Sequence, residues 1–172
     1  MRHSTALPAA WIFLRILIVL NWIGGALVLG LLAYTFVNEP WTMKALKVTA
    51  DADGHAFMNG MRTIAAFGLA AIPLNHMMFK RMLRIVETVR AGSPFVADNA
   101  YRLNTIAWIL LALQVLSMII GGIGEAISSP AHPLHLDAGF SPIGWLSVVL
   151  TFVLARVFAE GTLMREDLEG TI

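Results

Sequence analysis

Long apolar stretches alternate with short charged ones along the chain. Four stretches have about the 20 mainly apolar residues that a helix needs to cross a bilayer. They lie at about residues 9–36, 63–86, 105–127 and 140–162, and the second and fourth include a polar helical extension at their ends. The pattern predicts an all-α fold in which residues 1–172 form a single integral membrane domain, a four-helix transmembrane bundle.

The second apolar stretch passes without a break into an amphipathic helix that we expect to end near Arg90. Between Phe79 and Arg90, apolar residues recur at helical spacing and basic side chains lie on the other faces. The fourth stretch continues, with no proline, into a charged end that runs to Ile172. Arg156 and Glu160 stand four residues apart there and share one helix face.

Residues 91–95 (AGSPF) interrupt the helical pattern. Gly92 suits the position just after a helix C-terminus, and Ser93 followed by Pro94 suits the N-cap and first residue of a helix. We therefore expect a new helical segment to begin at Pro94 and to lead into the third span. The segment between the first two spans is long enough for a short interfacial helix of its own.

Basic residues near the span ends predict the orientation, because loops rich in Lys and Arg stay in the cytoplasm. The loop between the second and third spans carries five such residues, and the loop at 128–139 carries none. We expect the former to be cytoplasmic, the latter to lie outside, and both termini to be cytoplasmic. The five basic residues are Lys80, Arg81, Arg84, Arg90 and Arg102.

Composition agrees with a surface that faces lipid. The chain is 58% apolar and 13% charged, whereas a soluble domain carries about 25% charged residues. Its net charge of +1 gives no field that would favour direct binding of nucleic acid. The absence of cysteine excludes disulfides, thiolate catalysis and metals bound by cysteine. The partner that composition indicates is the lipid bilayer.

The two polar extensions carry opposite charge. Residues 80–102 hold five basic and two acidic side chains, net +3, and residues 156–172 hold two basic and four acidic ones, net −2. Because opposite charges on one side of a membrane attract, we expect the end of the fourth helix to lean on the extension of the second. The alternative is that the basic loop meets anionic headgroups, at about 1 kcal/mol per Lys or Arg, while the tail is solvated.

Two stretches carry a family resemblance. Residues 91–108 (AGSPFVADNAYRLNTIAW) fit the pattern G-x-P-F-x-x-x-N-x-x-R-L, and residues 154–172 (LARVFAEGTLMREDLEGTI) fit L-A-x-V-F-x-x-G-x-x-L-x-x-D-x-E-x-T-[IV], with Met164 in place of leucine. The chain thereby resembles a bacterial domain-of-unknown-function family of small four-span integral membrane proteins that includes YoaS. In the first stretch the matching residues are Gly92, Pro94, Phe95, Asn99, Arg102 and Leu103.

The resemblance implies a multi-pass protein of the bacterial inner membrane, with no enzyme activity to carry over. Genes of this family often lie beside one for a small helix-turn-helix regulator of the Xre type, which implies a cytosolic DNA-binding partner. We therefore expect a regulatory or scaffolding protein that engages such a regulator, or another protein, through its cytosolic face. The alternatives are a small-solute transporter or a structural subunit of a membrane complex, and homo-oligomerisation stays open.

The candidate docking residues lie in the two polar extensions and the loop between the second and third spans. They are Arg81, Arg84, Arg90, Pro94, Phe95, Asn99, Arg102, Arg156, Glu160, Arg165, Asp167 and Glu169.

Histidines and carboxylates gather in the loops expected outside. His132, His135 and Asp137, with His55 from the first loop, are candidate Zn²⁺ ligands. Their spacing fits poorly, because Pro133 keeps the two neighbouring histidines off one regular helix. They could instead sense acid outside the cell, but we favour the interpretation that they are ordinary loop residues, with no metal or other cofactor bound. Since the chain also lacks a nucleophile elbow, an H-E-x-x-H motif and a phosphate-binding glycine loop, we expect no enzyme activity.

Some uncharged residues of the spans predict close contacts with other parts of the protein. Asn21 and Gln114 lie deep in spans, where we expect hydrogen bonds between helices. Gly121, Gly122 and Gly124 lack side chains, which would let a neighbouring backbone approach the third span closely.

Overall fold

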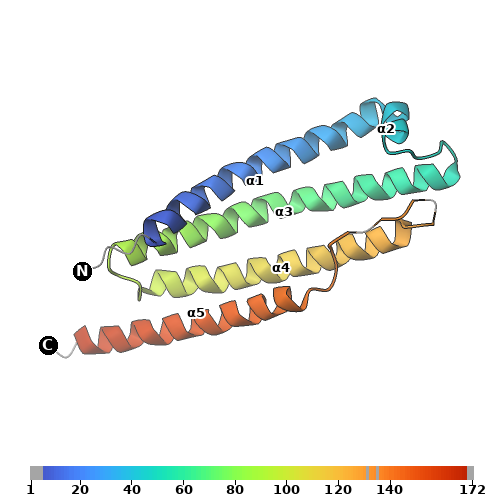
Figure 1. The fold of residues 1–172 in the computed structure, drawn as a ribbon. Helices are drawn as coiled ribbons and strands as arrows, with labels where there is room; N and C mark the ends of the chain where they lie inside the picture. The colour runs from blue at the N-terminus through green and yellow to red at the C-terminus, as the bar shows by residue number, and fades with distance from the viewer. Residues whose placement is uncertain (1–5, 131, 135, 170–172) are drawn as a thin grey trace. The chain divides into compact units, whose positions relative to one another are not determined.

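The computed structural model describes residues 6–130, 132–134 and 136–169, with side chains as far as Asp167. These residues form helices and loops, with no strand among them, so the predicted all-α class is confirmed, and four of the helices are long and apolar, as a four-helix bundle requires (Figure 1). The helices are α1 (Ala6–Val37), α2 (Glu39–Ala45), α3 (Ala52–Arg90), α4 (Ala97–Ile127) and α5 (Pro142–Glu169).

The long helices α1, α3, α4 and α5 are each long and apolar enough to cross a membrane, which indicates a multi-pass membrane protein. At 1.5 Å per residue, α3 with its 39 residues is about 58 Å long and α5 with 28 residues is about 42 Å. The hydrocarbon layer is only about 30 Å thick. Both helices are therefore longer than the hydrocarbon layer is thick.

The helical extensions predicted for the second and fourth spans are confirmed, since α3 runs to Arg90 and α5 to Glu169. After Arg90 the chain leaves the helix through a Schellman motif. Gly92 adopts the left-handed conformation, with φ 81°, and its N–H donates to Val89 O, while the N–H of Ser93 donates to Thr88 O.

The expectation that a helix begins at Pro94 is wrong, because α4 begins at Ala97. The carbonyl of Pro94 instead accepts a hydrogen bond from the side chain of Asn99, and the backbone N–H of Asn99 donates to Val96 O. A side chain from further along the chain thus holds residues 94–96 outside the helix.

Two compact units divide the chain, and three of the long helices pass from one to the other. Among the described residues, unit 1 consists of those within 1–21, 74–112 and 142–172, and it contains the end of α3, the start of α4 and all of α5. Unit 2 consists of those within 22–73 and 113–141, and it contains α2 and the loop after α4.

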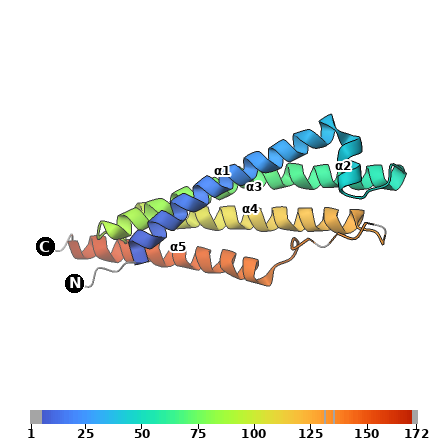
Figure 2. The same cartoon turned by 45° about the horizontal axis from the view of Figure 1, so that its top comes forward.

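In unit 2, the short helix α2 follows α1 directly, as Figure 2 shows. Asn38 caps it, because its Oδ1 accepts a hydrogen bond from the backbone N–H of Trp41 at 3.3 Å. Met43 of α2 packs with Val48 and with Met58 of α3 in a small buried cluster. The short helix expected in the segment before the second span is therefore present, and this cluster fixes it against α3.

The loop after α4 folds back along that helix instead of staying at its end. The carbonyl of Gly139 accepts hydrogen bonds from Gln114 Nε2 at 3.3 Å and Ser117 Oγ at 3.5 Å, and its N–H donates to Ser117 Oγ at 3.2 Å. Ser117 lies ten residues before Ile127, where α4 ends, which is about 15 Å along the helix axis. The expectation that Gln114 bonds to another helix is thus replaced by a bond to loop backbone.

Two of the three glycines in α4 make room for this returning loop. A Cβ atom at Gly121 would lie 2.7 Å from Ala138 O and 2.8 Å from the Cα of Gly139, and one at Gly124 would lie 2.5 Å from the side chain of Leu136. A Cβ at Gly122 would meet nothing within 4 Å. The close backbone approach expected here is present, and the backbone that approaches Gly121 belongs to the loop.

We predict opposite effects for the neighbouring substitutions Gly121→Ala and Gly122→Ala. At Gly121 the new methyl group displaces loop backbone and costs about 1–3 kcal/mol. At Gly122 it meets open space, so the helix gains about 0.5–1 kcal/mol from the propensity of alanine. Thermal unfolding in detergent should show a lower Tm for Gly121→Ala and an equal or higher one for Gly122→Ala. Equal shifts for both would show that the loop does not lie against Gly121.

Candidate functional site

Asn99, the third residue of α4, ties the preceding loop to both neighbouring helices in unit 1. Its Nδ2 donates to Thr88 Oγ1 at 2.6 Å and to Pro94 O at 2.8 Å, and its Oδ1 accepts from Arg102 Nη1 at 2.8 Å. Arg102 also pairs with the carboxylate of Asp98 at 2.8 Å. Asn99 is fully buried with its side-chain amide satisfied, so in this structure it positions the loop and offers no surface of its own.

The loop formed by residues 91–96 rests on the end of α5. The rings of Phe95 and Phe158 lie 5.3 Å apart, and the backbone at Gly161 passes so close that a Cβ there would lie 2.9 Å from Phe95 Cδ1. Arg165 Nη1 donates to the carbonyl of Phe95 at 3.5 Å. The end of α5 therefore meets the loop 91–96 rather than the helical extension of α3 that we expected it to lean on, and these contacts are made by two aromatic rings and by Arg165, which donates to loop backbone.

The basic residues of α3 take two kinds of position. Arg84 and Arg90 are exposed, and the Cζ of Arg90 lies 5.7 Å from the ring centroid of Trp11. Arg81 is half-buried, with its Cζ 5.8 Å from the ring centroid of Tyr101. Arg84 in particular offers an exposed positive charge at the end of α3.

On α5, the charged residues line the last turns. Arg156 Nε pairs with Glu160 Oε1 at 2.8 Å within the helix, and both side chains are more than half exposed. Asp167 is also exposed, and the side chain of Glu169 lies outside the described residues. The Arg156–Glu160 pair is a surface ion pair, which contributes at most about 1 kcal/mol to stability.

A groove of about 240 Å³ is formed between the loop 91–96 and the end of α5. Phe95 and Val96 line one side, and Thr162, Arg165 and Glu166 line the other. Beside it on α5, Leu163 and Met164 are exposed by 60% and 62%. Leu163 is 21 residues from the start of α5 at Pro142, or about 31 Å along the axis, so a hydrocarbon layer about 30 Å thick that began at Pro142 would end before these two side chains.

A polar cluster in unit 2 was not found by sequence reasoning. Glu39, at the start of α2, joins two residues of α3: its Oε2 lies 2.8 Å from Arg62 Nη2, and its Oε1 lies 3.0 Å from His55 Nδ1. Arg62 Nε also donates to Thr35 Oγ1 of α1 at 3.1 Å. The partners lie 16 to 27 residues apart, and only the folding of α2 against the other helices brings them together.

Arg62 lowers the pKa of Glu39 below its ordinary value of 4.5, and the main cause is the hydrogen bond that it donates to the carboxylate. A carboxylate with a lowered pKa stabilises the folded state above its ordinary pKa and loses that contribution as the pH falls through the lowered value. The link between α2 and α3 is therefore intact at neutral pH and weakens only in acid.

The three candidate metal ligands that the structure describes do not come together in one site. His55 pairs with Glu39, and Asp137 is exposed. The ring centroids of His132 and Phe57 lie 5.1 Å apart. His135 lies outside the described residues. Within residues 6–130, 132–134 and 136–169, no group of three or more His, Cys, Asp or Glu side chains is placed to hold a metal ion.

The model of a family described as proteins of unknown function (DUF2975) matches residues 39–172. No curated protein and no solved structure matches the chain. The match includes α2 to α5, and with them the loop 91–96 and the end of α5. The expectation of a family without a known function is thereby confirmed.

We predict that Asn99→Leu destabilises the protein much more than Asn104→Leu. The first leaves the half-buried Pro94 carbonyl without its hydrogen bond, at about 1–3 kcal/mol, and removes one of the two partners of the Thr88 hydroxyl, which still donates to Ile85 O, while Asn104 is exposed on the same helix. Thermal unfolding in detergent measures the difference. Limited proteolysis within residues 91–96 should also become faster in Asn99→Leu alone, and equal Tm and cleavage rates would contradict the role given to Asn99.

Proposed function

The chain belongs to the DUF2975 family of proteins of unknown function, and we propose that it is a membrane-anchored regulatory or scaffolding protein that binds a soluble protein partner. The proposed docking surface lies in unit 1 and consists of the last turns of α3, the loop 91–96 and the last turns of α5. The role is a binding role, with no catalytic step and no cofactor.

The observation that carries this proposal is the exposure of Leu163 and Met164, at least about 31 Å along α5 from its start at Pro142. The rest of the protein leaves these two side chains exposed, and the neighbouring α5 residues Arg165, Glu166 and Asp167 are charged and exposed. Burying one such side chain against a partner contributes about 1.5–3 kcal/mol. Apolar residues ringed by charge are the usual arrangement at the centre of a protein–protein interface.

The loop 91–96 makes this surface a defined one. Asn99 donates a hydrogen bond to the loop carbonyl of Pro94, and Phe95 packs on Phe158. These contacts fix the groove beside Thr162 in the absence of a partner. A surface that is ordered in advance binds with a smaller entropic cost than a mobile one. The exposed charge of Arg84 on α3 gives the partner a second point of contact with acidic groups.

The finer points of the proposal rest on the sequence. The five basic residues at the end of α3 and the start of α4 favour a cytoplasmic docking surface, with both termini on that side. The resemblance to the bacterial family that includes YoaS favours the inner membrane, and it favours a small helix-turn-helix regulator of the Xre type as the partner. Holding such a regulator at the membrane would keep it from DNA.

A capture experiment with a swapped control tests the surface. The protein in nanodiscs is immobilised and exposed to a soluble Xre-type helix-turn-helix protein of the kind whose genes often lie beside those of the family that includes YoaS. We predict that Leu163→Asn with Met164→Gln weakens capture at least tenfold, because the apolar centre is lost. The control Leu163→Met with Met164→Leu keeps the apolar surface and should bind as the native protein does.

Charge reversal tests the second contact. Arg84→Glu should weaken capture further, while Lys44→Glu, an exposed change on α2 of unit 2, should not. If the native protein captures the regulator and all the variants capture it equally, the docking surface is wrong. If the native protein does not bind it, the regulator is not the partner.

A further inference from the structure

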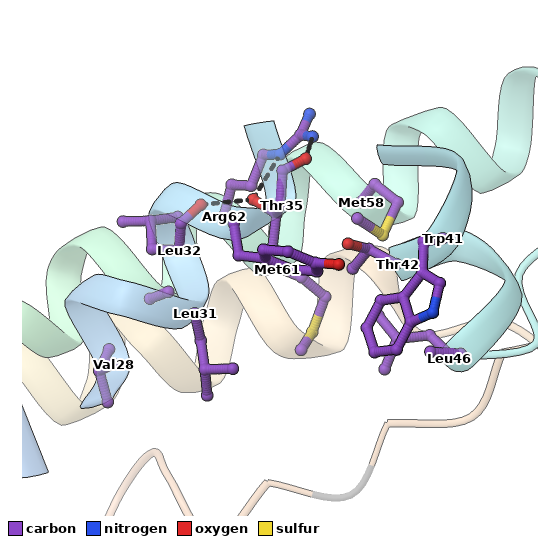
Figure 3. Close-up of a pocket in the computed structure, with 13 residues that line it drawn as sticks. Val28, Leu31, Leu32, Thr35, Trp41, Thr42, Leu46, Met58, Met61 and Arg62 are labelled. Carbon is purple, nitrogen blue, oxygen red and sulfur yellow. Dashed lines mark hydrogen bonds between the residues drawn. The ribbon is translucent and has the colours of Figure 1, made fainter. Parts of the chain in front are cut away.

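A cavity of about 330 Å³ opens in unit 2 between the second half of α1, α2 and the first half of α3 (Figure 3). Apolar side chains form most of its wall: Val28 and Leu31 come from α1, Leu46 follows α2, and Met61 comes from α3. Its volume falls in the range of small-molecule sites, about 300–1,000 Å³. Apolar walls of this kind do not hold water well, so the cavity is suited to an apolar guest.

The surroundings of the cavity indicate what that guest is. Leu31 and Leu46, which line it, are exposed by 66% and 47%, so its wall continues onto the outer surface of the protein. That surface belongs in part to α1, a helix long and apolar enough to cross the membrane, so α1 is surrounded by lipid chains. The lining runs from Val28 to Thr35 on α1, or about 10 Å along the axis, which matches part of one acyl chain.

One end of the cavity is polar but balanced in charge. Arg62 and Thr35 line that end (Figure 3). Glu39 neutralises the guanidinium, with its Oε2 2.8 Å from Arg62 Nη2. Beside it, the ring of Trp41 packs edge-on against Tyr34 with centroids 5.4 Å apart, and an indole at a membrane interface favours the headgroup level. Because the Arg62–Glu39 pair has no net charge, it does not select an anionic headgroup.

We propose that this cavity is a binding site for one hydrocarbon chain of a bilayer phospholipid, whose headgroup lies at the Arg62–Glu39 pair. The chain occupies the space between α1 and α3, and Trp41 flanks the headgroup. The site favours no headgroup charge as long as Glu39 covers Arg62. This inference concerns unit 2 alone, so it stands or falls independently of the partner proposed for unit 1.

Photolabelling with a matched pair of variants tests the site. The protein is placed in phosphatidylcholine vesicles that contain a trace of phosphatidylcholine with a diazirine in its acyl chain, and labelling of the peptide around Met61 is measured by mass spectrometry. Ala65→Phe fills the cavity, whereas Ala66→Phe adds the same ring at an exposed neighbouring position. We expect Ala65→Phe to lower labelling at Met61 about tenfold, and Ala66→Phe to leave it unchanged.

Labelling of Leu20, an exposed residue of α1 in unit 1, serves as the internal reference and should be equal in all three proteins. If labelling at Met61 survives Ala65→Phe, no chain occupies the cavity. If light instead produces a cross-linked dimer through a photoreactive residue at position 61, a second copy of the protein fills the cavity and the proposal fails. Equal Tm values establish that the variants are folded.

The headgroup position is tested with Glu39→Gln, which leaves the charge of Arg62 uncovered. When labelled phosphatidylglycerol and phosphatidylcholine compete, we expect the native protein to show equal labelling at Met61 and Glu39→Gln to favour the anionic lipid several-fold. An unchanged ratio would place the headgroup away from the Arg62–Glu39 pair and overturn that part of the proposal.

Discussion

Backbone polar groups at the depth of a bilayer must find partners within the protein, because hydrocarbon offers none. The long helices meet this requirement through their own hydrogen bonds. The loop after α4 meets it differently, because its backbone at Gly139 lies beside Ser117, in the middle of the apolar stretch of α4. Gln114 and Ser117 supply the missing partners, and Gly121 supplies the space. The loop that precedes α5 is therefore anchored to α4.

A similar arrangement occurs at the start of α4, where the side chain of Asn99 donates a hydrogen bond to the backbone carbonyl of Pro94. In both places a polar side chain of α4 fixes an irregular segment, and the segment in turn packs on a neighbouring element. In unit 1 that element is α5, through Phe95 and Phe158. Arg165, a charged residue of α5, adds a hydrogen bond to the carbonyl of Phe95. The helix α4 thus organises the loops, while α3 and α5 supply the proposed docking surface.

Local signals in the sequence were enough for much of this fold. The apolar stretches located the four long helices, because a run of about 20 mainly apolar residues is the length that a membrane-spanning helix requires. Gly92 located the end of α3, since glycine accommodates the left-handed conformation that ends a helix. The start of α4 was misplaced at Pro94, because the local preference of Ser-Pro was overridden by a hydrogen bond from Asn99.

Contacts between distant residues could not be foreseen in this way. Glu39 and Arg62 are 23 residues apart, and Gln114 and Gly139 are 25 apart, so nothing in the local pattern pairs them. Opposite charge predicted that residues 80–102 and 156–172 lie close together. The close approach in the structure is between Phe95 and Gly161, neither of which is charged. The matching of glycine to an aromatic ring depends on side-chain packing, which periodicity does not reveal.

Hydrogen exchange in nanodiscs tests the central claim most directly, that the returning loop is hydrogen-bonded to α4 at bilayer depth. The amide of Gly139 should exchange as slowly as those in the middle of α4, and Ser117→Ala should accelerate it without changing the rest of the helix. Exchange at Gly139 as fast as at Ala50, an exposed residue of the loop before α3, would show that the returning loop lies in water, and the account would be contradicted.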